Sequence, residues 1–290
     1  MKEYDKYLKL LKEKYPTKQS VYRELINLNA IMNLPKGTEH FMSDLHGEYD
    51  AFYHIINNCS GVIREKVAML YGDELTVYEQ QELCTLIYYP REKLSILMDE
   101  NKVNDEWYRN VLNHLIQIAK LLSSKYTRSK VRKAMPVDFA YIIDELIHAQ
   151  KDEDDNRSVY HRQIMETILS LHNGDEFLVA LTDLIKRLAV DHLHILGDIY
   201  DRGSHADKIL DLLMEHHSVD IQWGNHDILW MGAFCGNPVC MALVVRNNIK
   251  YKTMSILENG YGISLRFLLQ FAVNTYSCLL YTSPSPRDGA

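Results

Sequence analysis

Three short segments of this chain contain residue types that bind divalent cations and phosphate groups. They read SDLHGEYD at 43–50, GDIYDRG at 197–203 and GNHD at 224–227. Carboxylate, imidazole and amide side chains are ligands for hard or borderline divalent cations, and an arginine can hold a phosphate through two parallel hydrogen bonds. Together, these residues could perform the metal-assisted hydrolysis of a phosphoester.

Each segment also has a simpler interpretation when it is taken alone, because short motifs arise by chance. Asp44 and His46 could end a strand, with the aspartate capping the following helix. GDIYDRG could be a surface turn with an Asp–Arg ion pair, and GNHD could be a turn before a helix. Three such segments in this order, each at the end of a predicted strand, indicate one common site.

The elements that must position these segments are short strands. One strand is predicted at 38–43, and alternating apolar and polar residues predict two more near 192–196 and at 219–223. A helix predicted at 206–214 joins the last two strands. Ligands in α/β proteins gather at the carboxyl ends of such strands. We therefore predict an α/β catalytic core.

Helical spacing of apolar residues dominates the rest of the chain. It occurs over 4–33, with a break at Pro16, and from about residue 60 to 190. The acidic run 151–157 is expected to be a loop between two helices. The clearest helix of the long stretch is predicted at 106–120, and further helices are predicted at 137–150, 160–171 and 175–190.

This pattern divides the chain into four parts. The catalytic core is predicted at 37–59 and 190–276, and a helical insertion is predicted between them at 60–189. A chain tolerates so long an insertion because the entropy of loop closure grows slowly with length. A helical segment at 1–36 precedes the core, and a Ser/Pro-rich tail at 277–290 looks non-native.

Composition narrows the class of protein. The formal net charge of −7 argues against a nucleic-acid partner. No apolar run reaches the length of a bilayer span, and the first residues lack the apolar core of a signal peptide, so no membrane partner is expected. The five cysteines include no CxxC pair, which favours reduced thiols and a cytoplasmic location. Nothing in the sequence selects an oligomeric state.

The three motifs resemble the pattern of the calcineurin-like metallophosphoesterases, which is DxH, GDxxDRG and GNHE or GNHD, followed by two later histidines. The helical insertion, with KYTRSKVRKAMPVDFAYIIDELIH at 125–148, and the segment GDIYDRGSHADKILDLL at 197–213 are similar to the class 3 fructose-1,6-bisphosphatases. The resemblance extends to about residue 276. It implies a four-layer α-β-β-α metallophosphoesterase core with a large helical insertion.

The resemblance also implies an activity. It is the hydrolysis of fructose 1,6-bisphosphate, a small phosphorylated sugar, to fructose 6-phosphate and phosphate in gluconeogenesis. Two alternatives stay open. One is another metallophosphoesterase, such as a protein phosphatase or a dinucleoside-polyphosphate hydrolase, and the other is a non-catalytic phosphoesterase-like module.

A ligand set for two cations follows from the same resemblance. One cation would be held by Asp44, His46 and Asp198. The second would share Asp198 and take Asn225. Manganese is the usual metal of the family, and these ligand types also suit iron, zinc or magnesium.

The resemblance further assigns the proton transfer and the phosphate contacts. His226 would protonate the leaving sugar oxygen, and Asp201 would hold His226 in place. Arg202 would bind phosphate oxygens and stabilise the charge that grows on them, and Asn225 would also contact the substrate. Asp227 receives a supporting role only.

A basic run in the insertion could bind the second phosphate of a bisphosphate. The candidates for substrate binding are Arg128, Lys130 and Arg132, flanked by Lys125 and Lys133. The alternative is a solvated basic connector between helices.

No histidine follows His226, so the two later histidines of the pattern have no counterpart here. The second cation would then keep only Asp198 and Asn225 as protein ligands. We therefore expect this chain to be a truncated, N-terminal form with little or no activity of its own.

Overall fold

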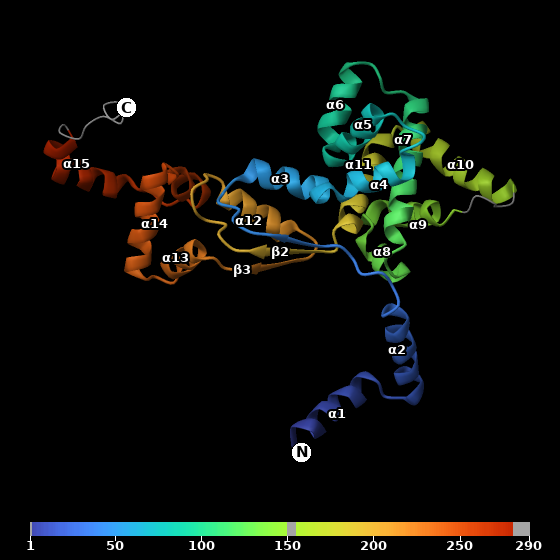
Figure 1. The fold of residues 1–290 in the computed structure, drawn as a ribbon, viewed down its shortest axis with the longest axis horizontal. Helices are drawn as coiled ribbons and strands as arrows, with labels where there is room; N and C mark the ends of the chain where they lie inside the picture. Colours follow the sequence, from blue (N-terminus) through green and yellow to red (C-terminus); the bar gives the residue numbers. More distant parts are fainter. Residues whose placement is uncertain (1, 150–154, 281–290) are drawn as a thin grey trace. The chain divides into compact units, whose positions relative to one another are not determined.

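The computed structural model of the protein describes residues 2–149 and 155–280, which divide into two units (Figure 1). The first unit contains the described residues of 1–39 and 56–192. The second unit contains those of 40–55 and 193–290. The α/β class predicted from the sequence is confirmed, since a small sheet accompanies many helices. The four-layer arrangement stays a prediction.

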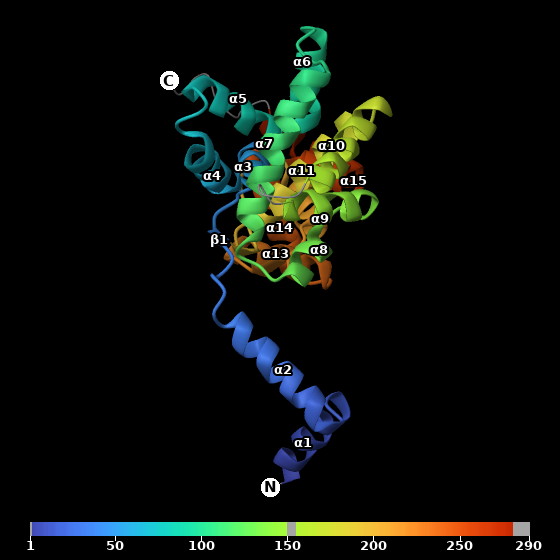
Figure 2. The ribbon, with the colours of Figure 1, turned by 90° about the vertical axis from the view of Figure 1, so that its right-hand side faces the viewer.

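Helices α7 (Asp105–Ser123) and α11 (Gly174–Ala189) form the centre of the first unit and lie side by side (Figures 1 and 2). Each presents an apolar face that is fully buried, including Leu115 and Ile118 on α7 and Phe177 on α11. Burial of one such side chain is worth about 1.5–3 kcal/mol. This helix pair therefore anchors the insertion that the sequence predicts.

Other helices surround that pair, and several of their ends follow local sequence signals. Thr76 and Glu79 form a capping box at the start of α5, and Asn104 accepts a hydrogen bond from the Trp107 amide at the start of α7. The remaining helices of this part of the chain are α4 (Val62–Tyr71), α5 (Val77–Tyr88), α6 (Pro90–Asp99), α8 (Arg128–Ala134), α9 (Ala140–His148) and α10 (Asp155–Ser170).

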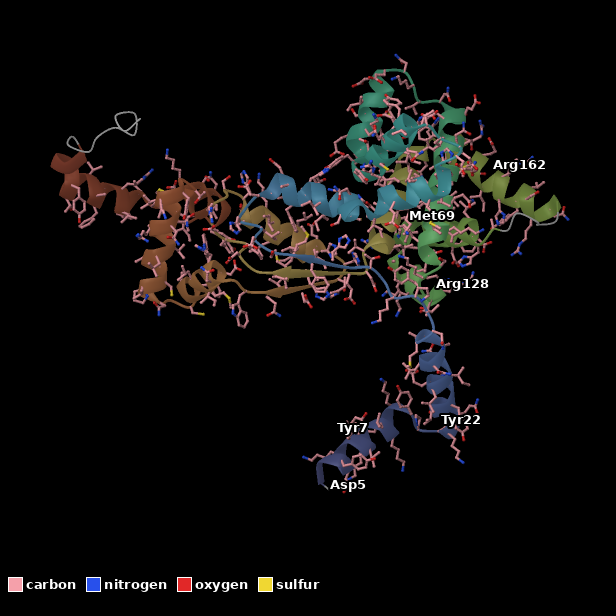
Figure 3. All side chains as sticks on the ribbon, in the orientation of Figure 1. Asp5, Tyr7, Tyr22, Met69, Arg128 and Arg162 are labelled. Atoms are coloured by element: carbon pink, nitrogen blue, oxygen red, sulfur yellow. The ribbon has the colours of Figure 1, made fainter. Side chains whose placement is uncertain are left out.

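The N-terminal segment forms two helices, α1 (Lys2–Lys14) and α2 (Lys18–Ile31), as the break at Pro16 predicts. Thr17 caps the second helix by accepting a hydrogen bond from the Ser20 amide. None of the residues of α2 is buried, and the side chains of Tyr7 and Tyr22 are exposed (Figure 3).

A three-stranded sheet carries the motif loops. Its strands are β1 (Glu39–Met42), β2 (His192–Leu196) and β3 (Val219–Gln222), in the order β1-β2-β3. The pairing of β2 with β3 is parallel, with Leu193 opposite Val219 and Ile195 opposite Ile221. All three strands lie within one residue of the predicted ranges.

Helices connect and follow these strands. Helix α12 (Ala206–Glu215) links β2 to β3, as predicted, and buries Ala206, Ile209 and Leu213. Helices α13 (Asn225–Phe234) and α14 (Pro238–Tyr251) pack on each other after β3. The other helices of this part are α3 (Tyr49–Asn58), which follows β1, and α15 (Arg266–Leu280). Among the described helices, none has both the length and the apolarity that a bilayer crossing needs.

The acidic run and the predicted tail lie only partly within the described residues. The acidic run 151–157 is not wholly a loop, because residues 155–157 begin α10, while 151–154 lie outside the described residues. Within the predicted tail, residues 277–280 belong to α15, and 281–290 lie outside the described residues.

Candidate active site

The three motif loops meet in the second unit. Each loop follows one strand of the sheet, and hydrogen bonds join the loops directly. The His46 amide donates to the Asp198 carbonyl at 2.8 Å, and the Gly203 amide donates to the His46 carbonyl at 2.6 Å. The His226 amide donates to the Asp198 carboxylate at 3.3 Å. Three distant parts of the sequence therefore form one site.

Glycines make this close approach of backbones feasible. A β-carbon on Gly47 would lie 2.6 Å from the Gly203 carbonyl oxygen, and one on Gly197 would overlap the backbone nitrogen of Gly224. Gly47 and Gly197 also have φ values of +70° and +87°, which favour glycine. The glycines of the motifs thus have a steric role in addition to a conformational one.

Gly197→Ala should therefore destabilise the second unit more than a substitution that introduces backbone strain alone. Gly236 provides the control, because its φ of +84° is similar and a β-carbon there would meet no atom within 4 Å. The strain of a left-handed backbone costs about 1–2 kcal/mol. Overlap at Gly197 should cost about 1–3 kcal/mol more.

Urea-induced unfolding of the Gly197→Ala and Gly236→Ala proteins measures this difference directly. Equal free energies of unfolding for the two variants would show that the contact between these two loops is not tight.

The three predicted ligands of the first cation share an unusual backbone conformation. Asp44, His46 and Asp198 have φ values of 54°, 49° and 51°, a region that residues other than glycine seldom occupy. Such strain costs about 1–3 kcal/mol per residue and persists only where the surroundings enforce it. The hydrogen bonds between the loops supply that constraint.

The side chains of these residues fit a divalent cation. One ligand atom from each of Asp44, His46 and Asp198 lies within 4.8 Å of the other two. His46 Nε2 lies 3.3 Å from Asp44 Oδ1. Hydrogen bonding to Ser43, which has the largest effect, and to His46 lowers the pKa of Asp44. The lower pKa keeps its carboxylate ionised. Two carboxylates and one imidazole suit manganese, iron, zinc or magnesium.

Asp201 is the buried centre of the site. Its side chain is only 3% exposed, and its oxygens contact three basic groups. They lie 3.0 Å from His46 Nδ1, 2.7 Å from Arg202 Nε and 3.3 Å from His226 Nε2. The sequence associated Asp201 with His226 but did not predict its contact with His46. Through that contact a carboxylate orients a predicted metal ligand, as is common around metal ions.

Arg202 contacts this centre, and Asn225 directly precedes His226, which also contacts it. The Arg202 side chain is 66% exposed, so its guanidinium faces solvent while Nε contacts Asp201. Asn225 is the first residue of α13 and follows Gly224, which packs against Asp198. An arginine held in this way is available to an anion arriving from solution.

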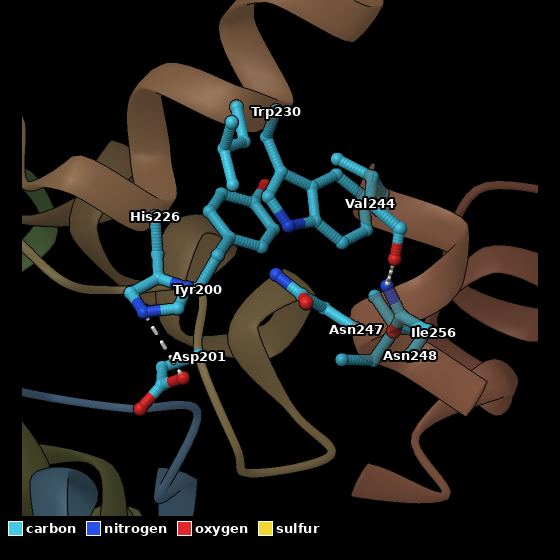
Figure 4. A pocket seen from close by; sticks show the side chains of 9 residues that line it. Tyr200, Asp201, His226, Trp230, Val244, Asn247, Asn248 and Ile256 are labelled. Atoms are coloured by element: carbon cyan, nitrogen blue, oxygen red, sulfur yellow. Dashed lines mark hydrogen bonds and ion pairs between the residues drawn. The ribbon is translucent and has the colours of Figure 1, made fainter. Parts of the chain in front are cut away.

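A small cavity adjoins His226 and Asp201 (Figure 4). Its volume of about 10 Å³ leaves room for about one water molecule. Tyr200 stacks on Trp230 at 4.3 Å and hydrogen-bonds Tyr261, and burial raises the pKa of the Tyr200 phenol. Tyr200 and Trp230 thus form an aromatic wall of the cavity beside His226.

Asp227 has more contacts than the sequence suggested. Asp227 is 7% exposed, and its two carboxylate oxygens accept three backbone hydrogen bonds. The donors are the amides of Ile199 and Tyr200, both at 3.0 Å, and of Gly224 at 2.8 Å. The sequence signal for this residue was its position three residues after the start of the GNHD turn, where a carboxylate can cap a helix.

The predicted second-phosphate residues belong to the first unit, on and around α8. Arg128 and Arg132 approach Asp144 at 3.4 and 3.7 Å, and Lys130 pairs with Asp191. The two arginines line an open hollow together with Ser129 and Lys133. More than half of the surface of each arginine side chain is exposed, so these pairs leave both guanidiniums accessible.

Comparison with known proteins decides the family. The sequence model described as "Firmicute fructose-1,6-bisphosphatase" matches residues 6–285. The chain belongs to this family. The predicted resemblance to class 3 fructose-1,6-bisphosphatases is thereby confirmed.

Individual relatives agree with this assignment. The chain is 53% identical over 286 residues to a fructose-1,6-bisphosphatase class 3 of Clostridium beijerinckii, covering 95% of this chain and 43% of that protein. It is 54% identical to one from Listeria monocytogenes (93% and 41% covered) and 51% identical to one from Bacteroides fragilis (94% and 41%). The chain therefore spans about two fifths of the length of these curated relatives. No solved structure matches it.

Proposed function

We propose that the protein is a metal-dependent phosphoric monoester hydrolase that converts fructose 1,6-bisphosphate to fructose 6-phosphate and phosphate. The observation that carries this proposal is the convergence of Asp44, His46 and Asp198 beside Asp201, in a chain of the fructose-1,6-bisphosphatase family. A role in gluconeogenesis follows from that reaction.

Two divalent cations, manganese in this proposal, would be held by Asp44, His46, Asp198 and Asn225. They would activate a water molecule and neutralise phosphate charge. The Asp201 carboxylate lies 3.0 Å from His46 Nδ1, and Nε2 is directed toward Asp44. The contact with Asp201 thus orients the imidazole before any ligand binds.

Proton transfer and phosphate binding fall to the residues around Asp201. His226 gives a proton to the leaving sugar oxygen, because its Nε2 contacts Asp201 and it borders the cavity. The contact between Nε and Asp201 orients the Arg202 side chain, and its remaining N–H donors bind the phosphate oxygens. Asn225 also contacts the substrate.

The proposal extends to the protein around the site. The sheet of the second unit would be part of a four-layer metallophosphoesterase core. The cysteine pattern supports a cytoplasmic location.

Arg128, Lys130 and Arg132 would bind the phosphate that is not hydrolysed. In a full-length version of the protein, changing Arg128 and Arg132 together to alanine should then raise KM for fructose 1,6-bisphosphate about tenfold or more, since each charged hydrogen bond is worth about 1.5–3 kcal/mol. Hydrolysis of p-nitrophenyl phosphate, which has one phosphate, should keep its KM. An unchanged KM for the bisphosphate would remove these residues from the substrate site.

A chimera tests the proposed activity. Residues 1–276 of this chain would replace the matching segment of the Clostridium beijerinckii relative, and phosphate release would be measured with manganese. We expect hydrolysis of fructose 1,6-bisphosphate and little hydrolysis of a phosphoserine peptide or a dinucleoside tetraphosphate. The unaltered relative serves as the reference, and circular dichroism verifies that the chimera folds. A folded chimera that prefers either of the other two substrates would contradict the proposal.

A further inference from the structure

We infer that Asp227 is a positioning residue, which fixes the distance between the Asp198 loop and the Asn225 turn and thereby sets the affinity for metal. The inference rests on the proposed function, because it concerns the same metal site. The role follows from the hydrogen bonds of Asp227 to the backbone and needs no direct contact between Asp227 and a ligand.

The carboxylate of Asp227 joins two loops that the sequence separates. One oxygen accepts hydrogen bonds from Ile199 and Tyr200, which directly follow the predicted ligand Asp198. The other oxygen accepts from Gly224, which directly precedes the predicted ligand Asn225. The two predicted ligands are thus held relative to each other through a single side chain.

Burial makes these three bonds strong. Asp227 is 7% exposed, and no Lys, Arg or His of the described chain forms an ion pair with it. The hydrogen-bond partners of its carboxylate in the described chain are backbone N–H groups. Hydrogen bonds to an ionised acceptor are about twice as strong as neutral ones. A buried amide that loses its acceptor costs about 1–3 kcal/mol, so the loop positions depend on this carboxylate.

The same two loops pack tightly against each other, so a small displacement of one loop changes the geometry of the predicted metal site. Gly197 and Gly224 pack with no room for a β-carbon between the two loops. The Asp198 carboxylate also accepts a hydrogen bond from the His226 amide. When the Asp227 bonds are lost, the amides of Ile199 and Tyr200 lose their acceptor, and the stacking of Tyr200 on Trp230 does not replace these backbone bonds, so the ligand oxygens shift apart.

Asp227→Asn tests this role with little change in shape. The amide has only one acceptor oxygen, so its NH₂ group must face either Gly224 or the Ile199–Tyr200 pair, where donor would meet donor. Asn237→Ala is the matched control. The Asn237 side chain also accepts two backbone hydrogen bonds, from Val239 and Cys240, but it caps α14 away from the motif loops.

Two measurements on the chain decide the inference. In Mn²⁺ titration calorimetry, Asp227→Asn should weaken binding about 10–100-fold, as expected for loss of a group that orients metal ligands, while Asn237→Ala should leave it within about twofold. In metal-free hydrogen exchange by NMR, the amides of Ile199, Tyr200 and Gly224 should exchange at least about tenfold faster in Asp227→Asn.

The outcomes distinguish a failure of the positioning role of Asp227 from a failure of the proposed function. Faster exchange at Gly224 alone, with a Mn²⁺ affinity equal to that of Asn237→Ala, would reduce Asp227 to a helix cap and overturn the inference. A wild-type chain that binds no Mn²⁺ would contradict the proposed function. Hydrogen exchange would then still decide whether Asp227 joins the loops.

Discussion

Asp198→Asn should weaken Mn²⁺ binding by about 100-fold or more. Asp198 is the residue that both proposed cations would share, and losing even an outer group at a metal site costs about 10–100-fold in affinity. Asparagine tolerates the left-handed backbone that Asp198 adopts at a φ of 51° and keeps an oxygen for the His226 amide. The loss should therefore come from the missing charge and not from unfolding.

Calorimetry of Mn²⁺ binding measures this effect, and Asp211→Asn is its control. Asp211 lies on the exposed side of α12, and its substitution makes the same change in net charge. If both variants bound Mn²⁺ as tightly as the wild type, Asp198 would not be a metal ligand.

His226→Asn should lower kcat for fructose 1,6-bisphosphate about 10²–10⁴-fold in the chimera described above, because general acid catalysis contributes about this much. The effect should depend on the leaving group. A sugar alkoxide needs a proton as it departs, whereas p-nitrophenolate is stable without one. Hydrolysis of p-nitrophenyl phosphate should therefore suffer much less.

The comparison of the two substrates distinguishes proton transfer from a general loss of structure. His172→Asn is the control, since His172 is an exposed histidine of the first unit with a backbone conformation that asparagine accepts. Equal losses with both substrates would show that His226 acts in binding or folding instead of protonating the leaving group.

Periodicity was enough to predict the elements that carry the site. Alternation around Leu193 and Ile195 predicted β2, and that strand end places Asp198 in a loop. The parallel partner β3 then brings Asn225 and His226 to the same edge of the sheet. Local patterns predict such features because the period of two and the glycines after each strand are properties of neighbouring residues.

Other features depend on contacts between distant residues and were not predictable in this way. The link between Asp201 and His46 joins two loops, and the three bonds of Asp227 require the folded sheet. The start of α10 at Asp155 shows a similar limit, because the acidic run before it has the composition of a loop. Tertiary packing decides each of these cases.

The most direct test of the site is a crystal of the chain soaked in Mn²⁺, with diffraction recorded at the manganese absorption edge. The anomalous difference map should show a peak in contact with the side chains of Asp44, His46 and Asp198. A map without density at these residues, in crystals whose Mn²⁺ appears elsewhere, would contradict the metal site on which the proposed hydrolysis depends.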